Sequence, residues 1–96
     1  MKIIIIEVTC EDKEDAERLA DILLAKKLIE CANINSGVNS LYRLKDKIEN
    51  KREAILCLKT VKDKTNDIVE VIKKEHGYEA PAIIKIEAES LDEGYS

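Results

Sequence analysis

The sequence predicts an α+β fold in which two helices cover one face of a four-stranded antiparallel sheet. Three observations predict it: four apolar segments of strand character, two segments of helical periodicity, and their alternating order along 96 residues. A chain of this length forms one domain, residues 1–96, because independent domains below roughly 50 residues are rare. The three aromatic residues are all Tyr, so the core must come from Ile, Leu, Val and Ala.

The first half of the chain predicts a strand, a helix and a second strand. Residues 2–8 are apolar and mostly β-branched, which is typical of a strand buried on both faces. A helix follows, with Asp12 as its N-terminal cap and Lys26 and Lys27 closing its last turn. Its apolar residues have the spacing of one buried face: Ala16, Leu19, Ala20, Leu23 and Leu24. The second strand then begins near residue 31.

The middle of the chain predicts a long hairpin. Asn35, Ser36 and Gly37 have turn chemistry inside its first strand, which predicts a bulge or kink. Residues 45–47 form a charged tip, and the return strand covers residues 53–60.

A second helix is predicted over residues 62–75, with Gly77 as a left-handed residue just past its end. Pro81 marks the start of the last strand, residues 82–89. The complete order, βαββαβ, is that of the ferredoxin-like sandwich, an antiparallel sheet with two helices on one face.

Strands that are apolar on both faces predict an oligomer, because two helices can cover only one face of the sheet. The first strand carries Ile4 and Ile6 on one side and Ile3 and Ile5 on the other. A monomer would expose one of these sets, and exposed apolar patches usually mark an interface. We therefore expect an obligate homo-oligomer.

Composition argues against several classes of function. The net charge is −4 and basic residues are interspersed with acids, so no nucleic-acid partner is expected. No stretch approaches the roughly 20 apolar residues of a membrane span, so no membrane partner is expected either. The 3 cysteines include no C-x-x-C, which favours reduced thiols and a cytoplasmic location. No nucleophile–base pattern is present, so we do not expect an enzyme.

Four side chains could carry chemistry. His76, the single histidine, is either a hydrogen-bonding residue at a helix end or a ligand for Cu²⁺ or Zn²⁺. Cys31 is either a small apolar residue or a thiolate ligand, and Cys57 is expected in the core. Cys10 is expected in an exposed loop, where it could be an accessory metal ligand. A site built on His76 would need thiolate or carboxylate neighbours, supplied if necessary across a subunit boundary.

Five short strings occur in an order and spacing that resemble the divalent-cation tolerance (CutA) family. They are Cys-Ala-Asn-Ile at 31–34, Ser-Leu-Tyr at 40–42, Lys-Ile-Glu at 47–49, Lys-Thr at 59–60 and His-Gly-Tyr-Glu-Ala-Pro-Ala-Ile-Ile at 76–84. The resemblance implies a ferredoxin-like subunit in a tight homotrimer that binds divalent metal, copper in particular, without catalysis.

The resemblance also implies which residues form the sites. The predicted metal ligands are Cys31 and His76. The trimer of this family is similar in shape to PII-type signalling proteins, so the alternative function is a signalling or scaffold trimer with a small ligand between subunits. Residues carried over to such a cleft are Asn33, Tyr42, Lys47, Lys59, Thr60 and Tyr78, with Pro81 in support.

The sequence departs from the family pattern at three positions. The family usually has Trp at Leu44, Gly at Asp46 and Pro at Gly77. The missing Trp argues against a ligand that stacks on an aromatic ring. Relatives also continue beyond the position of Ser96 into a further helix that contributes to trimer packing.

Overall fold

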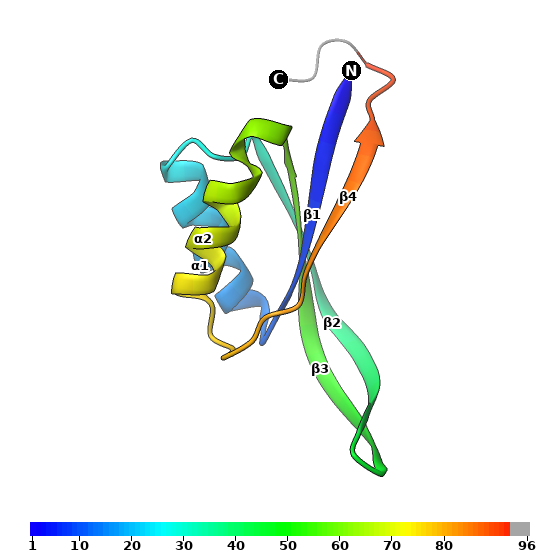
Figure 1. Cartoon of the computed structure of the whole chain (residues 1–96). Coiled ribbons are helices and arrows are strands. Elements are labelled where there is room, and N and C mark those ends of the chain that lie inside the picture. Colours follow the sequence, from blue (N-terminus) through cyan, green and yellow to red (C-terminus); the bar gives the residue numbers. More distant parts are fainter. Residues whose placement is uncertain (93–96) are drawn as a thin grey trace.

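The computed structural model describes residues 1–92. Ser96, beyond which relatives continue, lies outside the described residues. The strands form an antiparallel sheet in the order β2-β3-β1-β4. Both helices lie on the same side of this sheet (Figure 1), which confirms the ferredoxin-like βαββαβ prediction. The elements are β1 (Lys2–Cys10), α1 (Lys13–Ala25), β2 (Cys31–Leu44), β3 (Lys47–Thr60), the 3₁₀ turn η1 (Lys62–Lys64), α2 (Thr65–Glu75) and β4 (Ile83–Glu89).

The core fills the space between the helices and the two central strands. Ile6 and Val8 of β1 lie opposite Leu58 and Leu56 of β3, and all four side chains are fully buried. Because alternate residues of a strand point to opposite faces, the intervening residues of β1 and β3 lie on the helix-free face. The predicted burial of β1 on both faces is confirmed at Ile3, which is only 8% exposed on that second face.

The two ends of α1 differ in how well the sequence predicts them. The Asp12 cap is confirmed, since its Oδ1 accepts the backbone N–H of Asp15 at 2.8 Å. The predicted last turn is wrong: α1 ends at Ala25, and Lys27 adopts a left-handed conformation (φ 58°) beyond it. Leu24 is also misplaced by the prediction and is 43% exposed, because successive residues turn by about 100° and bring it to the edge of the buried stripe.

Gly77 does not have the left-handed conformation that was predicted for it. The helix α2 ends at Glu75, and His76 continues in an extended conformation (φ −69°, ψ 146°). Gly77 instead lies against α1, where a β-carbon would come within 3.4 Å of Asp15 Oδ2.

The hairpin extends beyond the helical layer. The predicted bulge is confirmed by the register shift between Asn35 and Val38 and by Gly37, whose φ is 68°. Pairing of β3 with β1 ends at Ala54, opposite Cys10. Residues 38–53, here called the hairpin arm, therefore have only each other as strand neighbours, and they project away from the helices (Figure 1).

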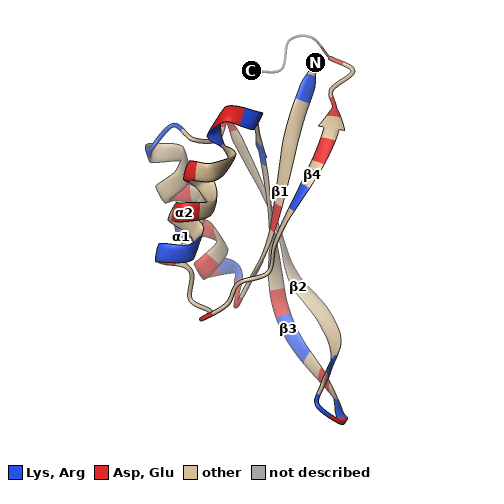
Figure 2. Ribbon diagram, viewed as in Figure 1, with Lys and Arg blue, Asp and Glu red and all other residues tan. Residues whose placement is uncertain are grey.

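The helix-free face of the sheet carries apolar side chains that no element within residues 1–92 covers. Ile84 and Ile86 on β4 are 52% and 43% exposed, and Ile5 and Cys57 beside them are half-buried. The prediction of a core position for Cys57 is therefore wrong. Charged residues of both signs mix on the helices and at the arm tip, whereas β2 carries almost none (Figure 2). No helix within residues 1–92 is long and apolar enough to cross a membrane.

Candidate functional site

Three metal-ligating side chains meet where β1 ends, α1 begins and α2 ends. Cys10 is the last residue of β1, Asp15 lies in the first turn of α1, and His76 caps the C-terminus of α2. One ligand atom from each, a sulfur, a carboxylate oxygen and a ring nitrogen, lies within 4.8 Å of the other two. Among residues 1–92 this is the one group of three or more such residues. We call it the Cys10–Asp15–His76 cluster.

The carboxylate of Asp15 is held on one side and free on the other. Arg18 donates to Asp15 Oδ1 at 2.9 Å and also to the carbonyl oxygen of Glu75, which ties α1 to the end of α2. The other oxygen, Asp15 Oδ2, is buried and has no hydrogen-bond donor among the described residues. Buried acceptors without a partner are rare in native proteins, so this oxygen is a place where a cation would be stabilised.

The imidazole of His76 is fixed by backbone groups on both sides. Its Nε2 lies 2.9 Å from the carbonyl oxygen of Thr9, and its Nδ1 accepts the backbone N–H of Tyr78 at 2.8 Å. The interpretation of His76 as a hydrogen-bonding residue at a helix end is therefore confirmed. The same contacts fix the position of the ring, one nitrogen of which lies within 4.8 Å of the Cys10 sulfur and of an Asp15 oxygen.

Cys10 is completely buried, so the prediction of an exposed loop position is wrong. The strand β1 runs two residues further than predicted, and the alternation that buries Ile6 and Val8 buries Cys10 as well. Burial, reinforced by the negative charge of Asp15, raises the pKa of the Cys10 thiol from 9.0 to about 11. At neutral pH the thiol is protonated unless a cation displaces its proton.

This raised pKa predicts a loss of stability at alkaline pH. Below pH 9 the thiol is protonated in both folded and unfolded chains, so it adds no pH dependence. Between pH 9 and pH 11 only the unfolded chain ionises, and the free energy of unfolding falls. We expect about 2 kcal/mol over this window, measured by urea denaturation in the presence of a chelator. The variant Cys10→Ala should show a correspondingly flatter profile, and an identical profile would contradict the assignment.

A second network connects His76 to the base of the hairpin arm. The ring of Tyr78 lies 5.2 Å from that of His76, centroid to centroid. The Tyr78 hydroxyl donates to Glu53 Oε2 at 2.6 Å, and Lys51 Nζ lies 4.5 Å from the centre of the Tyr78 ring. Burial, together with the hydrogen bond to Glu53, raises the pKa of Tyr78, so the phenol remains a donor at neutral pH.

Cys31 does not join His76 within one chain. It lies opposite Lys59 on β3 and therefore on the helix-free face, whereas His76 lies at the end of the helical layer. The Cys31 sulfur is 3.8 Å from Asn33 Oδ1 on the same face. Cys31 could reach a His76 side chain only in another copy of the chain.

The residues predicted to line a cleft are scattered over one subunit. Asn33 and Lys59 lie on the helix-free face, Tyr42 lies on the arm, and Lys47 lies at its tip. Thr60 is buried among the core residues, and its hydroxyl donates to the carbonyl oxygen of Leu28 at 3.0 Å. A shared cleft built from this set stays a prediction.

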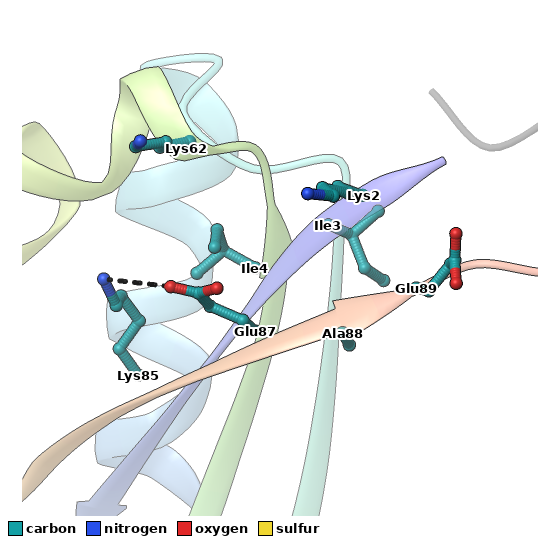
Figure 3. Close-up of a pocket in the computed structure, with 8 residues that line it drawn as sticks. All are labelled: Lys2, Ile3, Ile4, Lys62, Lys85, Glu87, Ala88 and Glu89. Atoms are coloured by element: carbon teal, nitrogen blue, oxygen red, sulfur yellow. Dashed lines mark ion pairs between the residues drawn. The ribbon is translucent and has the colours of Figure 1, made fainter.

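A pocket between β1, β4 and η1 is lined by other residues than the cluster. Residues of β1, β4 and η1 surround a pocket of about 370 Å³ that contains none of the predicted site residues (Figure 3). Lys85 Nζ and Glu87 Oε1 lie 3.9 Å apart on its rim, and both side chains are largely exposed. Exposed pairs of this kind contribute little binding energy, so the cluster is the stronger candidate.

Comparison with known proteins decides the family. Residues 4–96 match the family model described as CutA1 divalent ion tolerance protein. The chain belongs to this family. A curated CutA relative, the divalent-cation tolerance protein of Pyrococcus horikoshii, is 38% identical over 92 residues, which cover 96% of this chain and 89% of that protein.

Solved CutA structures have the same fold. The CutA1 structure from Ehrlichia chaffeensis superposes with a TM-score of 0.90 at 38% identity, covering 95% of this chain and 85% of that one. A structure from Archaeoglobus fulgidus, named as a periplasmic divalent cation tolerance protein CutA, superposes with a TM-score of 0.88 at 33% identity, covering 95% and 88%. The resemblance noted in the sequence is thus confirmed, and it places this chain among divalent-cation tolerance proteins.

Proposed function

We propose that this protein is a non-enzymatic homotrimer of the cytoplasm that binds a divalent metal ion, Cu²⁺ or Zn²⁺, at the Cys10–Asp15–His76 cluster. The observation that carries the proposal is the convergence of three donors on one point, with one carboxylate oxygen buried and unpaired. Thiolate, imidazole and carboxylate are the ligands that zinc and copper take in proteins.

The cluster fits such an ion in composition and nearly in size. Ligand atoms of a tetrahedral zinc lie about 3.3–3.8 Å apart, given bonds of roughly 2.0–2.3 Å. The three donors lie within 4.8 Å of one another, so they need to approach by about 1.5 Å at most. The bound cation would pair Asp15 Oδ2 and would displace the thiol proton of Cys10. Three protein ligands and a water molecule make a common coordination set.

The same geometry supports a binding rather than a catalytic role. The pKa of Cys10, about 11, keeps its thiol protonated and weakly nucleophilic at neutral pH. The exposed apolar residues Ile84 and Ile86 support the trimer, since another copy could cover them.

Calorimetric titration of the full chain with Zn²⁺ tests the site. The wild-type protein should bind at micromolar affinity or better. Both Cys10→Ser and His76→Ala should weaken binding at least 100-fold, because changes that merely disturb the orientation of a ligand already cost about 10–100-fold.

The matched control is Cys31→Ser, which removes a thiol from the helix-free face. Its affinity for Zn²⁺ should equal that of the wild type if the cluster is the site. If Cys31→Ser loses affinity and Cys10→Ser does not, the ligands are Cys31 and His76 from different copies, and the cluster is rejected.

A further inference from the structure

The imidazole of His76 has one in-plane lone pair, and a hydrogen bond already uses it. Nε2 lies 2.9 Å from the carbonyl oxygen of Thr9, which can only accept, so Nε2 carries the ring hydrogen. Nδ1 is therefore the acceptor of the Tyr78 N–H, at 2.8 Å. Metals bind neutral imidazole through a lone pair. A metal ion at His76 consequently competes with Tyr78.

Both ways of binding a metal break the bond between Tyr78 and His76. A metal at Nδ1 displaces the Tyr78 N–H directly. A metal at Nε2 requires the ring hydrogen to move to Nδ1. Nδ1 is then a donor that faces the Tyr78 N–H, which is also a donor, so no hydrogen bond can form between them. In this second case the imidazole keeps its single hydrogen and stays neutral. The carbonyl oxygen of Thr9 loses the N–H that it accepted from Nε2.

Tyr78 is also a contact between the body of the protein and the hairpin arm. Beyond Ala54, β3 no longer pairs with β1. At this point the Tyr78 hydroxyl donates to Glu53 at 2.6 Å, and its ring faces Lys51 at 4.5 Å. The backbone of Tyr78 thus holds His76 while its side chain holds the base of the arm.

We propose that metal binding at the Cys10–Asp15–His76 cluster detaches Tyr78 from His76 and thereby loosens the hairpin arm. This inference rests on the metal site proposed above and adds a regulated element to it. Whether the cluster holds a metal ion thus affects the hairpin arm, which projects away from the helices and the rest of the sheet. Because coupling between two sites is reciprocal, loss of the Tyr78 contact to the arm changes metal affinity by the same factor, in favour of binding.

Hydrogen–deuterium exchange of the full-length protein, with and without saturating Zn²⁺, tests the proposal. Amides of residues 38–53 should exchange about fivefold faster with zinc, the equivalent of one net hydrogen bond. Amides of the β1–β3 pairing should not change. In Tyr78→Phe, which lacks the hydroxyl that reaches Glu53, the arm should exchange faster without zinc, and zinc should add little.

Asn50→Ala is the control, because it truncates an exposed side chain of the arm itself and should behave as the wild type. Calorimetry on the same samples separates the two proposals. Zinc binding without faster exchange of the arm overturns the release of Tyr78 and leaves the metal site intact. An absence of zinc binding overturns both.

Discussion

Replacement of Ile86 by aspartate is expected to convert the proposed trimer into monomers. Ile86 lies on the helix-free face opposite Ile5, and it is 43% exposed in the single chain. The folded subunit therefore tolerates a carboxylate at this position. An unpaired charge buried between copies costs several kcal/mol, which is enough to separate them. Size-exclusion chromatography with light scattering at micromolar concentration measures the change.

The control for this substitution lies on the same strand. Lys85 precedes Ile86 and points to the opposite face, so Lys85→Asp introduces the same side chain away from the proposed interface. It should leave the oligomer intact. If Ile86→Asp elutes with the wild-type mass, the helix-free face is not the surface through which copies associate.

Replacement of Leu56 by alanine is expected to lower the free energy of unfolding by about 3–4 kcal/mol. Leu56 is fully buried, and its strand neighbours are Val8 on β1 and Ile34 on β2. The truncated side chain leaves a cavity between the sheet and the helices, which cannot collapse around it because three strands fix the backbone. The loss is a large share of the roughly 5–15 kcal/mol that stabilises a domain.

Urea denaturation at one fixed protomer concentration measures this loss, because the proposed association would also stabilise the folded chain. Leu24→Ala is the comparison, since Leu24 is 43% exposed on α1. The same chemical change there should cost less than about 1 kcal/mol. Equal losses in the two variants would contradict the position of the core.

The fold was predictable because local signals and burial agree. The apolar run of β1 and the stripe of α1 each specify one structure, and both occur where they were expected. The helix ends were less predictable. Lys27 adopts the left-handed conformation that glycine usually takes. Gly77 does not, because His76 already leaves the helix in an extended conformation.

The site was predictable only in part. His76 was identified as a candidate, but its partners come from two other elements whose approach no local pattern reveals. One signal was available: Cys10 continues the alternation of Ile4, Ile6 and Val8, which would have placed it in the core. The position of Cys31 depended on the register between β2 and β3, and periodicity within one strand cannot give the register of a pair.

The bulge near Gly37 separates the hairpin into two segments that can vary independently. Before the bulge, odd-numbered residues of β2 share a face with odd-numbered residues of β3. After the bulge, even-numbered residues of β2, such as Tyr42, share a face with the odd-numbered residues of β3. Two residues of β2, Ser36 and Gly37, face the single residue Ala54 of β3 at the bulge. Deleting one of them would restore a regular ladder, with Tyr42 still opposite Glu49. A residue can therefore be gained or lost at this point without changing which side chains the arm presents or how the interior is packed.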